Sequence, residues 1–242
     1  MGRKQSETSF IGQITSGISV NTVALRTIVF VREQLPIWRD DPDRPDEQSE
    51  NKLNLQLCKF LDARAQNDFP MVRFDHEEYQ SGHRSVDLSA SLAESIVLEA
   101  KPYTIYDPIL VLEGKRLPAP SSDREKEYVT GSTPKKISGG IQRFKLGLHG
   151  AKFNIAAMIG YVQDRSARHW YNKINEWISE LISDPIGDGC VWIASETLES
   201  LKEDKAKGIA SYRSVHSRTA GDEIELHHLW IAMNEGRVIR HR

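Results

Sequence analysis

Apolar residues recur at helical spacing in four parts of the chain. In the first, a stripe at i, i+4, i+7 and i+8 is formed by Leu53, Leu57, Phe60 and Leu61. This spacing places the four side chains on one face, so we predict an amphipathic helix that begins near Glu47. Further helices are predicted over residues 137–148, with Ser138 as a cap, over 170–181, and over 196–207, ending at Gly208.

Other stretches carry the patterns of strands. Residues 85–91 alternate between polar and apolar side chains, which predicts a half-buried strand. The continuous apolar run from Ile109 to Leu112 suits a central strand buried on both faces, and we expect it to end before Glu113. Additional strands are predicted over residues 23–31, 71–79 and 153–162.

The order of these elements indicates one α/β domain with a mixed central sheet. A β-hairpin predicted over residues 209–218 and 223–233 is expected to extend that sheet. The chain has 242 residues, enough for one large domain or two small ones. We predict a single domain over residues 46–242 and an N-terminal extension over residues 1–45. That extension could be an arm, a dimer contact or part of the sheet.

Composition excludes several classes of protein. Hydrophobic residues make up 39% and charged residues 27% of the chain, as in ordinary globular proteins. The two cysteines form no motif, and the eight histidines show no zinc-ligand spacing. No apolar run approaches the ~20 residues of a membrane span, and no signal peptide is visible, so we expect a cytoplasmic protein without membrane contact. Walker A, nucleotide-binding glycine and serine-hydrolase motifs are missing.

Candidate chemistry lies at the end of the apolar run. Residues two apart on a strand share a face, so Glu113 and Lys115 project together, and Gly114 leaves room on the opposite face. Asp87 interrupts the alternating strand upstream, and it would approach Glu113 if the two strands are neighbours. Two such carboxylates suit Mg²⁺, with Mn²⁺ as a substitute. A lysine beside them could position an attacking water.

Asp87 followed by Glu113-Gly114-Lys115 resembles the PD-(D/E)XK nuclease superfamily, the restriction-endonuclease-like fold. The resemblance covers roughly residues 47–185, and segments such as 112–117, 139–144 and 158–162 resemble nuclease subunits of bacterial antiphage defence systems. It implies a three-layer α/β/α core and Mg²⁺-dependent hydrolysis of DNA phosphodiester bonds.

The resemblance also implies further residues and partners. Glu50 would be an additional acidic ligand, and Gln142 and Arg143 would face the site and position phosphate. Homodimers or control by a partner, such as an ATPase or helicase, are expected. The sequence departs from the family in one respect, since Asp87 follows Ser85-Val86 rather than a proline.

Alternatives remain for each of these residues. Glu99 and Lys101 form a second E-x-K triplet, only 12 residues beyond Asp87. Glu113 and Lys115 could be a surface ion pair, and Asp87 could cap a turn. Glu50 could act only on the helix dipole, and Gln142 and Arg143 could simply be exposed. A catalytically inactive subunit that binds DNA or a partner is therefore the alternative function.

Charge is unevenly distributed although the formal net charge is only −2. Ten basic and three acidic residues between 124 and 174 give a net of +7, which predicts a basic half-surface if they share a face. The predicted contacts to nucleic acid are Lys135, Lys136, Gln142, Arg143 and Lys145. Residues 33–50 carry a net of −5. This acidic loop could balance the basic surface, or could cover it until a partner displaces it.

Overall fold

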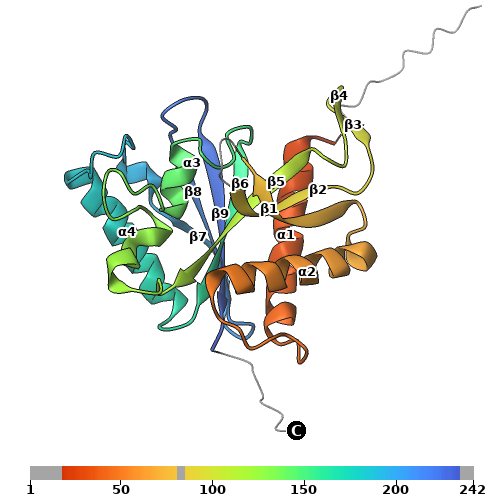
Figure 1. Ribbon diagram of the computed structural model, residues 1–242, viewed down its shortest axis with the longest axis horizontal. Helices are drawn as coiled ribbons and strands as arrows, with labels where there is room; N and C mark the ends of the chain where they lie inside the picture. Colours follow the sequence, from red (N-terminus) through yellow and green to blue (C-terminus); the bar gives the residue numbers. More distant parts are fainter. Residues whose placement is uncertain (1–17, 81–84, 235–242) are drawn as a thin grey trace, which may run out of the picture.

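Seven strands form a mixed sheet between two layers of helices in the computed structural model, which describes residues 18–80 and 85–234 (Figure 1). Their order is β1-β2-β5-β6-β9-β8-β7. The bounds along that order are Val72–Tyr79, Ser85–Leu92, Pro108–Leu117, Ile155–Val162, Ile224–Ala232, Ile209–His216 and Glu199–Asp204. β6 pairs in parallel with β5 and β9, whereas the other pairs are antiparallel. The predicted α/β fold class and mixed sheet are confirmed.

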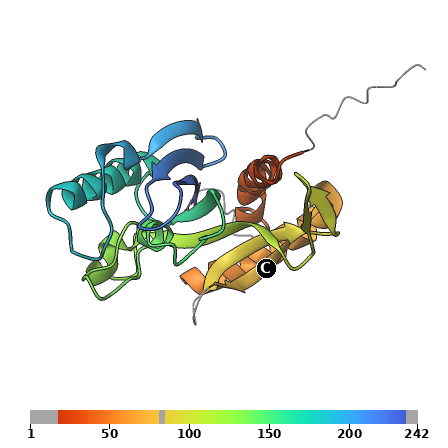
Figure 2. The ribbon, with the colours of Figure 1, turned by 90° about the horizontal axis from the view of Figure 1, so that it is seen from above.

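Each face of the sheet has its own hydrophobic cluster. α1 (Val20–Arg39) and α2 (Glu50–Asp68) cover one face, where even-numbered residues of β2 and β5, such as Leu88 and Leu112, point toward them. The 3-10 helix η1 (Ser122–Tyr128), α3 (Gly140–Lys145) and α4 (Ala167–Ser183) cover the other face. Figure 2 shows strands β8 and β9 (blue) between α4 (teal) and α1 (red).

The predicted strand over residues 23–31 is wrong, because this stretch lies inside α1. Its β-branched residues favour a strand locally, but Val23, Ile28 and Val31 share one helical face that is buried against the sheet. Ser19 caps the helix by accepting the Thr22 N–H. The predicted extension thus includes a helix that contributes to the core, and its residues 1–17 lie outside the described part of the chain.

The predicted helix over residues 196–207 is also wrong. Residues 194–196 form the short 3-10 helix η2 (Ala194–Glu196), and β7 follows as a solvent-exposed edge strand paired with β8. Gly208, at a φ of 62°, ends the turn between these strands rather than a helix. The predicted C-terminal hairpin is confirmed as β8 and β9, which extend the sheet through the parallel pairing of β9 with β6.

The remaining elements are a short hairpin and the extended end of β5. β3 (Ile96–Leu98) and β4 (Lys101–Tyr103) form a two-stranded sheet of their own. β5 continues to Leu117 instead of ending at Leu112, because the Glu113 and Lys115 side chains find charged partners inside the protein.

Candidate active site

The candidate site lies where β2 and β5 separate. Their antiparallel register ends at the pair Leu88–Leu112, and beyond it the carboxylate of Asp87 accepts the backbone N–H of Gly114 at 2.8 Å. Glu50, the first residue of α2, reaches the same place and accepts the backbone N–H of Arg116 at 3.3 Å. Asp87 therefore lies within a strand and does not cap a turn, and Glu50 both begins a helix and faces β5.

Lys115 joins the carboxylates of this site. Its Nζ lies 2.7 Å from Glu50 Oε1 and 3.1 Å from Glu113 Oε1, and all three side chains are largely or fully buried. Burial alone would lower the pKa of Lys115, but the charges of Glu113, Glu50 and Asp87 raise it above its usual range. The ammonium therefore remains charged, and the structure brings together the four residues predicted from the sequence.

Glu113 is surrounded by basic side chains. Arg143 Nη1 on α3 donates to Glu113 Oε1 at 2.9 Å, and His149 Nδ1 lies 3.1 Å from Glu113 Oε2. Burial acts to raise the pKa of Glu113, but Lys115, His149 and Arg143 together lower it well below its usual range. Arg143 was predicted at this site, whereas His149 was not, because no sequence pattern connects it to Glu113, 36 residues away.

Asp87 has the opposite protonation behaviour. Burial, followed by the charge of Glu113, raises its pKa to about 8, although Lys115 and the Gly114 N–H act against that rise. Two neighbouring carboxyl groups thus differ, since the pKa of Glu113 is lowered and that of Asp87 is raised. Such a separation of pKa values is common in active sites.

The donor set fits a hard divalent cation in part. Asp87 and Glu113 supply carboxylate oxygens that repel each other, and Glu113 Oε2 is buried without a well-aligned hydrogen bond. Over residues 18–80 and 85–234, however, no three acidic, histidine or cysteine side chains converge on one point as a ready metal site. The oxygens of Glu50 and Glu113 face Lys115 and Arg143 instead.

Gly114 permits the close approach of α2 to β5. A Cβ atom at this position would lie 1.9 Å from Asn54 Oδ1, which also accepts the hydroxyl of Tyr161 at 2.8 Å. The room expected opposite Glu113 and Lys115 is therefore filled by α2. Through this contact the glycine sets the distance between α2, which carries Glu50, and the strand that carries Lys115.

Gln142 does not face the site as predicted. It is fully buried, its Oε1 accepts the N–H groups of Gly131 and Gly139 at 3.0 Å each, and its Nε2 donates to Asp188. The amide stabilises the loop before α3, which leaves no free group for a phosphate. Its neighbour Arg143 points the other way, toward Glu113, because adjacent helical residues lie about 100° apart.

Lys145 does not lie on a basic surface. It is buried, and its Nζ donates to Glu196 Oε1 and to the carbonyl of Ser217 at 3.1 Å. The ammonium also lies 4.9 Å from the ring centre of Trp192. The predicted contact with nucleic acid is therefore wrong, because this charge is neutralised inside the second hydrophobic cluster.

A buried chain of hydrogen bonds crosses the hairpin from His216, which lies beside Glu196 without a hydrogen bond to it. His216 Nδ1 lies 3.7 Å from Glu196, and Ser214 Oγ lies 2.7 Å from Nε2 of both His216 and His228. His228 Nδ1 contacts the Tyr128 hydroxyl at 2.8 Å. This chain connects β8 and β9 to η1, and Glu196 connects it to α3, so it supports the helix that carries Arg143.

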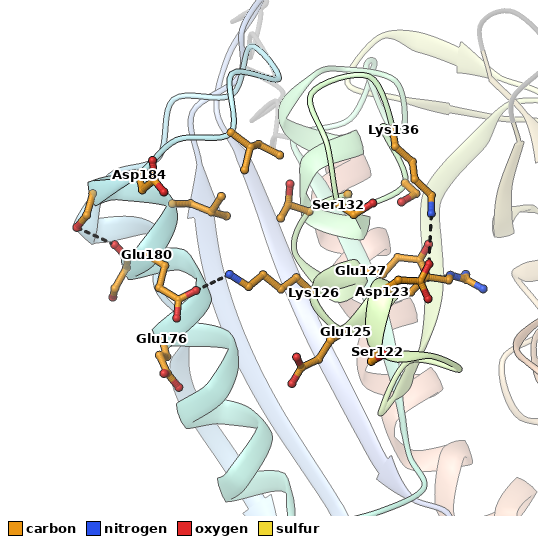
Figure 3. A pocket seen from close by; sticks show the side chains of 18 residues that line it. Ser122, Asp123, Glu125, Lys126, Glu127, Ser132, Lys136, Glu176, Glu180 and Asp184 are labelled. Carbon is orange, nitrogen blue, oxygen red and sulfur yellow. Dashed lines mark hydrogen bonds and ion pairs between the residues drawn. The ribbon is translucent and has the colours of Figure 1, made fainter.

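Lys135 and Lys136 are exposed, and the surroundings of Lys136 are acidic. Lys136 lies 4.0 Å from Asp123 at a groove that has a volume of about 820 Å³ and runs between η1 and α4 (Figure 3). Lys126 crosses it to Glu180. Its lining has three basic residues and six acidic ones, namely Asp123, Glu125, Glu127, Glu176, Glu180 and Asp184. This groove is therefore not part of the basic half-surface that was predicted for residues 124–174 on the condition that their side chains share a face.

The alternative E-x-K triplet is separate from this site. Glu99 lies in the turn of the β3–β4 hairpin at a φ of 51°, and Lys101 follows in β4, with both side chains exposed.

Among the described residues, no helix is long and apolar enough to cross a bilayer. No protein-family model, curated protein or solved structure matches the chain.

Proposed function

We propose that the protein is a metal-dependent nuclease that hydrolyses DNA phosphodiester bonds. The observation that carries this proposal is the position of Lys115, whose ammonium lies between Glu50 and Glu113 at the point where β2 and β5 separate beside Asp87. A buried lysine among three carboxylates is costly for folding, and such arrangements are typical of functional sites.

Asp87 and Glu113 would hold Mg²⁺ or Mn²⁺, and Glu50 would join them if Lys115 released it. The cation would polarise a phosphoryl oxygen and lower the pKa of a bound water. The fit rests on the unaligned Glu113 oxygen and on the repulsion between Asp87 and Glu113.

The other roles belong to cationic side chains. Lys115 would orient the attacking water and stabilise negative charge that develops on the phosphoryl group. The partly exposed Arg143 would hold a non-bridging phosphate oxygen with the N–H groups that do not contact Glu113. Water oxygen bonds to phosphorus, the bond to the leaving oxygen breaks, and that oxygen takes up a proton while the other proton of water passes to solvent.

The biological setting of this proposal rests on the resemblance to nuclease subunits of bacterial antiphage systems. We propose an effector that works in the cytoplasm under the control of a partner protein of the ATPase or helicase type. Such control is expected because an unregulated nuclease would damage the DNA of its own cell.

A second candidate function is an inactive subunit of the same fold that binds DNA or a partner. It is favoured by the three basic side chains, Lys115, Arg143 and His149, that contact Glu113 at 2.9–3.1 Å. In this interpretation the charges stabilise the fold and would not be released for a metal.

Cleavage of supercoiled plasmid and of single-stranded DNA distinguishes the two. We would compare wild type with Lys115→Ala in Mg²⁺, Mn²⁺ and EDTA, and use Lys202→Ala, at an exposed position of the edge strand β7, as a matched control for the loss of one positive charge. The nuclease proposal predicts metal-dependent cleavage that Lys115→Ala reduces by at least about 10²-fold and Lys202→Ala leaves nearly unchanged.

Two results would count against the nuclease. Equal cleavage by wild type and Lys115→Ala would place the activity in another site or another protein. Absence of metal-dependent cleavage on either substrate, together with DNA binding that is insensitive to Mg²⁺, would favour the inactive subunit.

A further inference from the structure

α1 presents an apolar face to solvent. Its opposite face is buried in the core, but Leu25, Val29 and Ile37 are 39%, 51% and 49% exposed. Leu25 and Val29 lie one helical turn apart and about 40° apart around the helix, and Ile37 lies two turns later and about 80° further around. Large aliphatic side chains aligned on one exposed helical face indicate a surface that another protein covers.

Two opposite charges lie beside the pair Leu25 and Val29, between this pair and Ile37 around the helix. Arg26 and Glu33 are seven residues apart and therefore differ by only about 20° around the helix, so they lie along the same edge. Neither forms an ion pair or a hydrogen bond with another residue of the described ranges. Arg26 comes three residues before Val29, and Glu33 comes four residues after it.

A groove lies beside the apolar face. It has a volume of about 430 Å³, and α1 lines it together with Asp68 and Phe69 at the end of α2. The rings of Phe30 and Phe69 stack in it with their centres 5.4 Å apart. The face therefore continues into a concave aromatic surface that could accept an aliphatic side chain.

We infer that a second copy of this chain covers the α1 face, with the two α1 helices antiparallel about a two-fold axis near Val29. Such an axis makes the second helix run in the opposite direction, and it leaves the edges that carry Arg26 and Glu33 on the same side of the interface in both copies. Along the helix, Arg26 lies about 4.5 Å before Val29 and Glu33 lies about 6 Å after it. Because the second helix runs in the opposite direction, Arg26 of each copy faces Glu33 of the other. The α1 face is thus complementary to itself in charge.

This arrangement is independent of the proposed nuclease activity, since none of its residues belongs to the candidate active site. A helix of 20 residues is about 30 Å long. Because α1 supplies only part of the ~800 Å² per partner of a standard interface, we expect micromolar affinity.

Sedimentation equilibrium tests the inference on the full chain. We expect wild type to change from monomer to dimer between about 1 and 100 µM. Val29→Glu would abolish the dimer. Arg26→Glu or Glu33→Arg alone would lower the dimerisation affinity by about tenfold or more, because the two-fold symmetry turns both Arg26–Glu33 pairs into pairs of like charge. The double variant Arg26→Glu/Glu33→Arg would restore dimerisation, because the two charges exchange places.

Val191→Glu is the matched control, because Val191 is an exposed aliphatic residue far from α1 in sequence and lies outside the helices and strands. Circular dichroism would verify that each variant is folded. A wild type that remains monomeric, a dimer unaffected by Val29→Glu, or a charge-exchanged variant as weak as the single variants would overturn the inference. In the first case a different protein or residues 1–17 would be the remaining candidates to cover the face.

Discussion

Replacing Gly114 with alanine tests the packing on which the candidate site depends. The added Cβ would lie 1.9 Å from Asn54 Oδ1 and 2.8 Å from Asn54 Cγ, distances far inside van der Waals contact. Asn54 is fully buried and holds the Tyr161 hydroxyl, so it has little freedom to turn away. Either the asparagine leaves its hydrogen bond or α2 moves away from β5.

The size of the effect follows from these two outcomes. Overpacking of a core typically costs about 1–3 kcal/mol, and loss of the Tyr161 hydrogen bond adds about 1 kcal/mol. Alanine gains about 0.5–1 kcal/mol over glycine within a strand, because glycine loses more backbone entropy on folding. We therefore expect Gly114→Ala to lower the free energy of unfolding by about 2 kcal/mol.

Urea denaturation of a double-mutant cycle isolates the contact. Asn54→Ala alone should destabilise the protein by about 1–3 kcal/mol, because the buried Tyr161 hydroxyl loses its partner. In that background Gly114→Ala should cost nearly nothing, since the space is then empty. An equal cost of Gly114→Ala with and without Asn54 would refute the proposed contact between α2 and β5.

Two further predictions concern the buried charges under α3 and the hairpin. Lys145→Met should destabilise the protein by about 3–5 kcal/mol in urea denaturation, because it leaves Glu196 buried without a cation. Adding Glu196→Gln to this variant should recover much of the lost stability. A loss below about 1 kcal/mol for Lys145→Met would contradict a buried ion pair. Burial lowers the pKa of His216 and His228, so the unfolded chain binds protons that the folded protein does not. The raised pKa of Asp87 acts in the opposite direction over this range, so the test uses an Asp87→Asn variant. Its free energy of unfolding should fall as pH decreases below the unfolded histidine value of about 6.5, by up to about 1.4 kcal/mol per pH unit for each histidine. Urea midpoints of this variant that are equal at pH 7.5 and 5.5 would refute it.

Local patterns were sufficient to predict the central part of the fold and the core of the site. The alternation at 85–91 and the apolar run at 109–112 are properties of single strands, and they placed Asp87 and Glu113 on strands whose pairing was left as a condition. The structure pairs these strands. Glu50 was implied by the resemblance, which places a further acidic residue on the helix before them. The strand predictions depend on one element each, which is why local patterns were sufficient for them.

The errors arise where tertiary contacts decide. The β-branched residues of α1 favour a strand until the buried helical face is known, and Gly208 suits a hairpin turn as well as a helix end. Lys145 is one of many surface-like lysines in the sequence, and only the fold shows Glu196 beside it. His149 was missed because its contact with Glu113 depends on the loop that follows α3.

Binding of Mn²⁺ is the most direct test of the candidate active site, since it does not require the trigger that a controlled nuclease would need. Electron paramagnetic resonance would follow a titration of Mn²⁺ with wild type, Glu113→Gln and the control Lys135→Ala. We predict one bound ion per chain in wild type and in Lys135→Ala, and an affinity at least about tenfold lower in Glu113→Gln. Equal binding by wild type and Glu113→Gln, or no binding by wild type, would contradict a metal centre at Asp87 and Glu113.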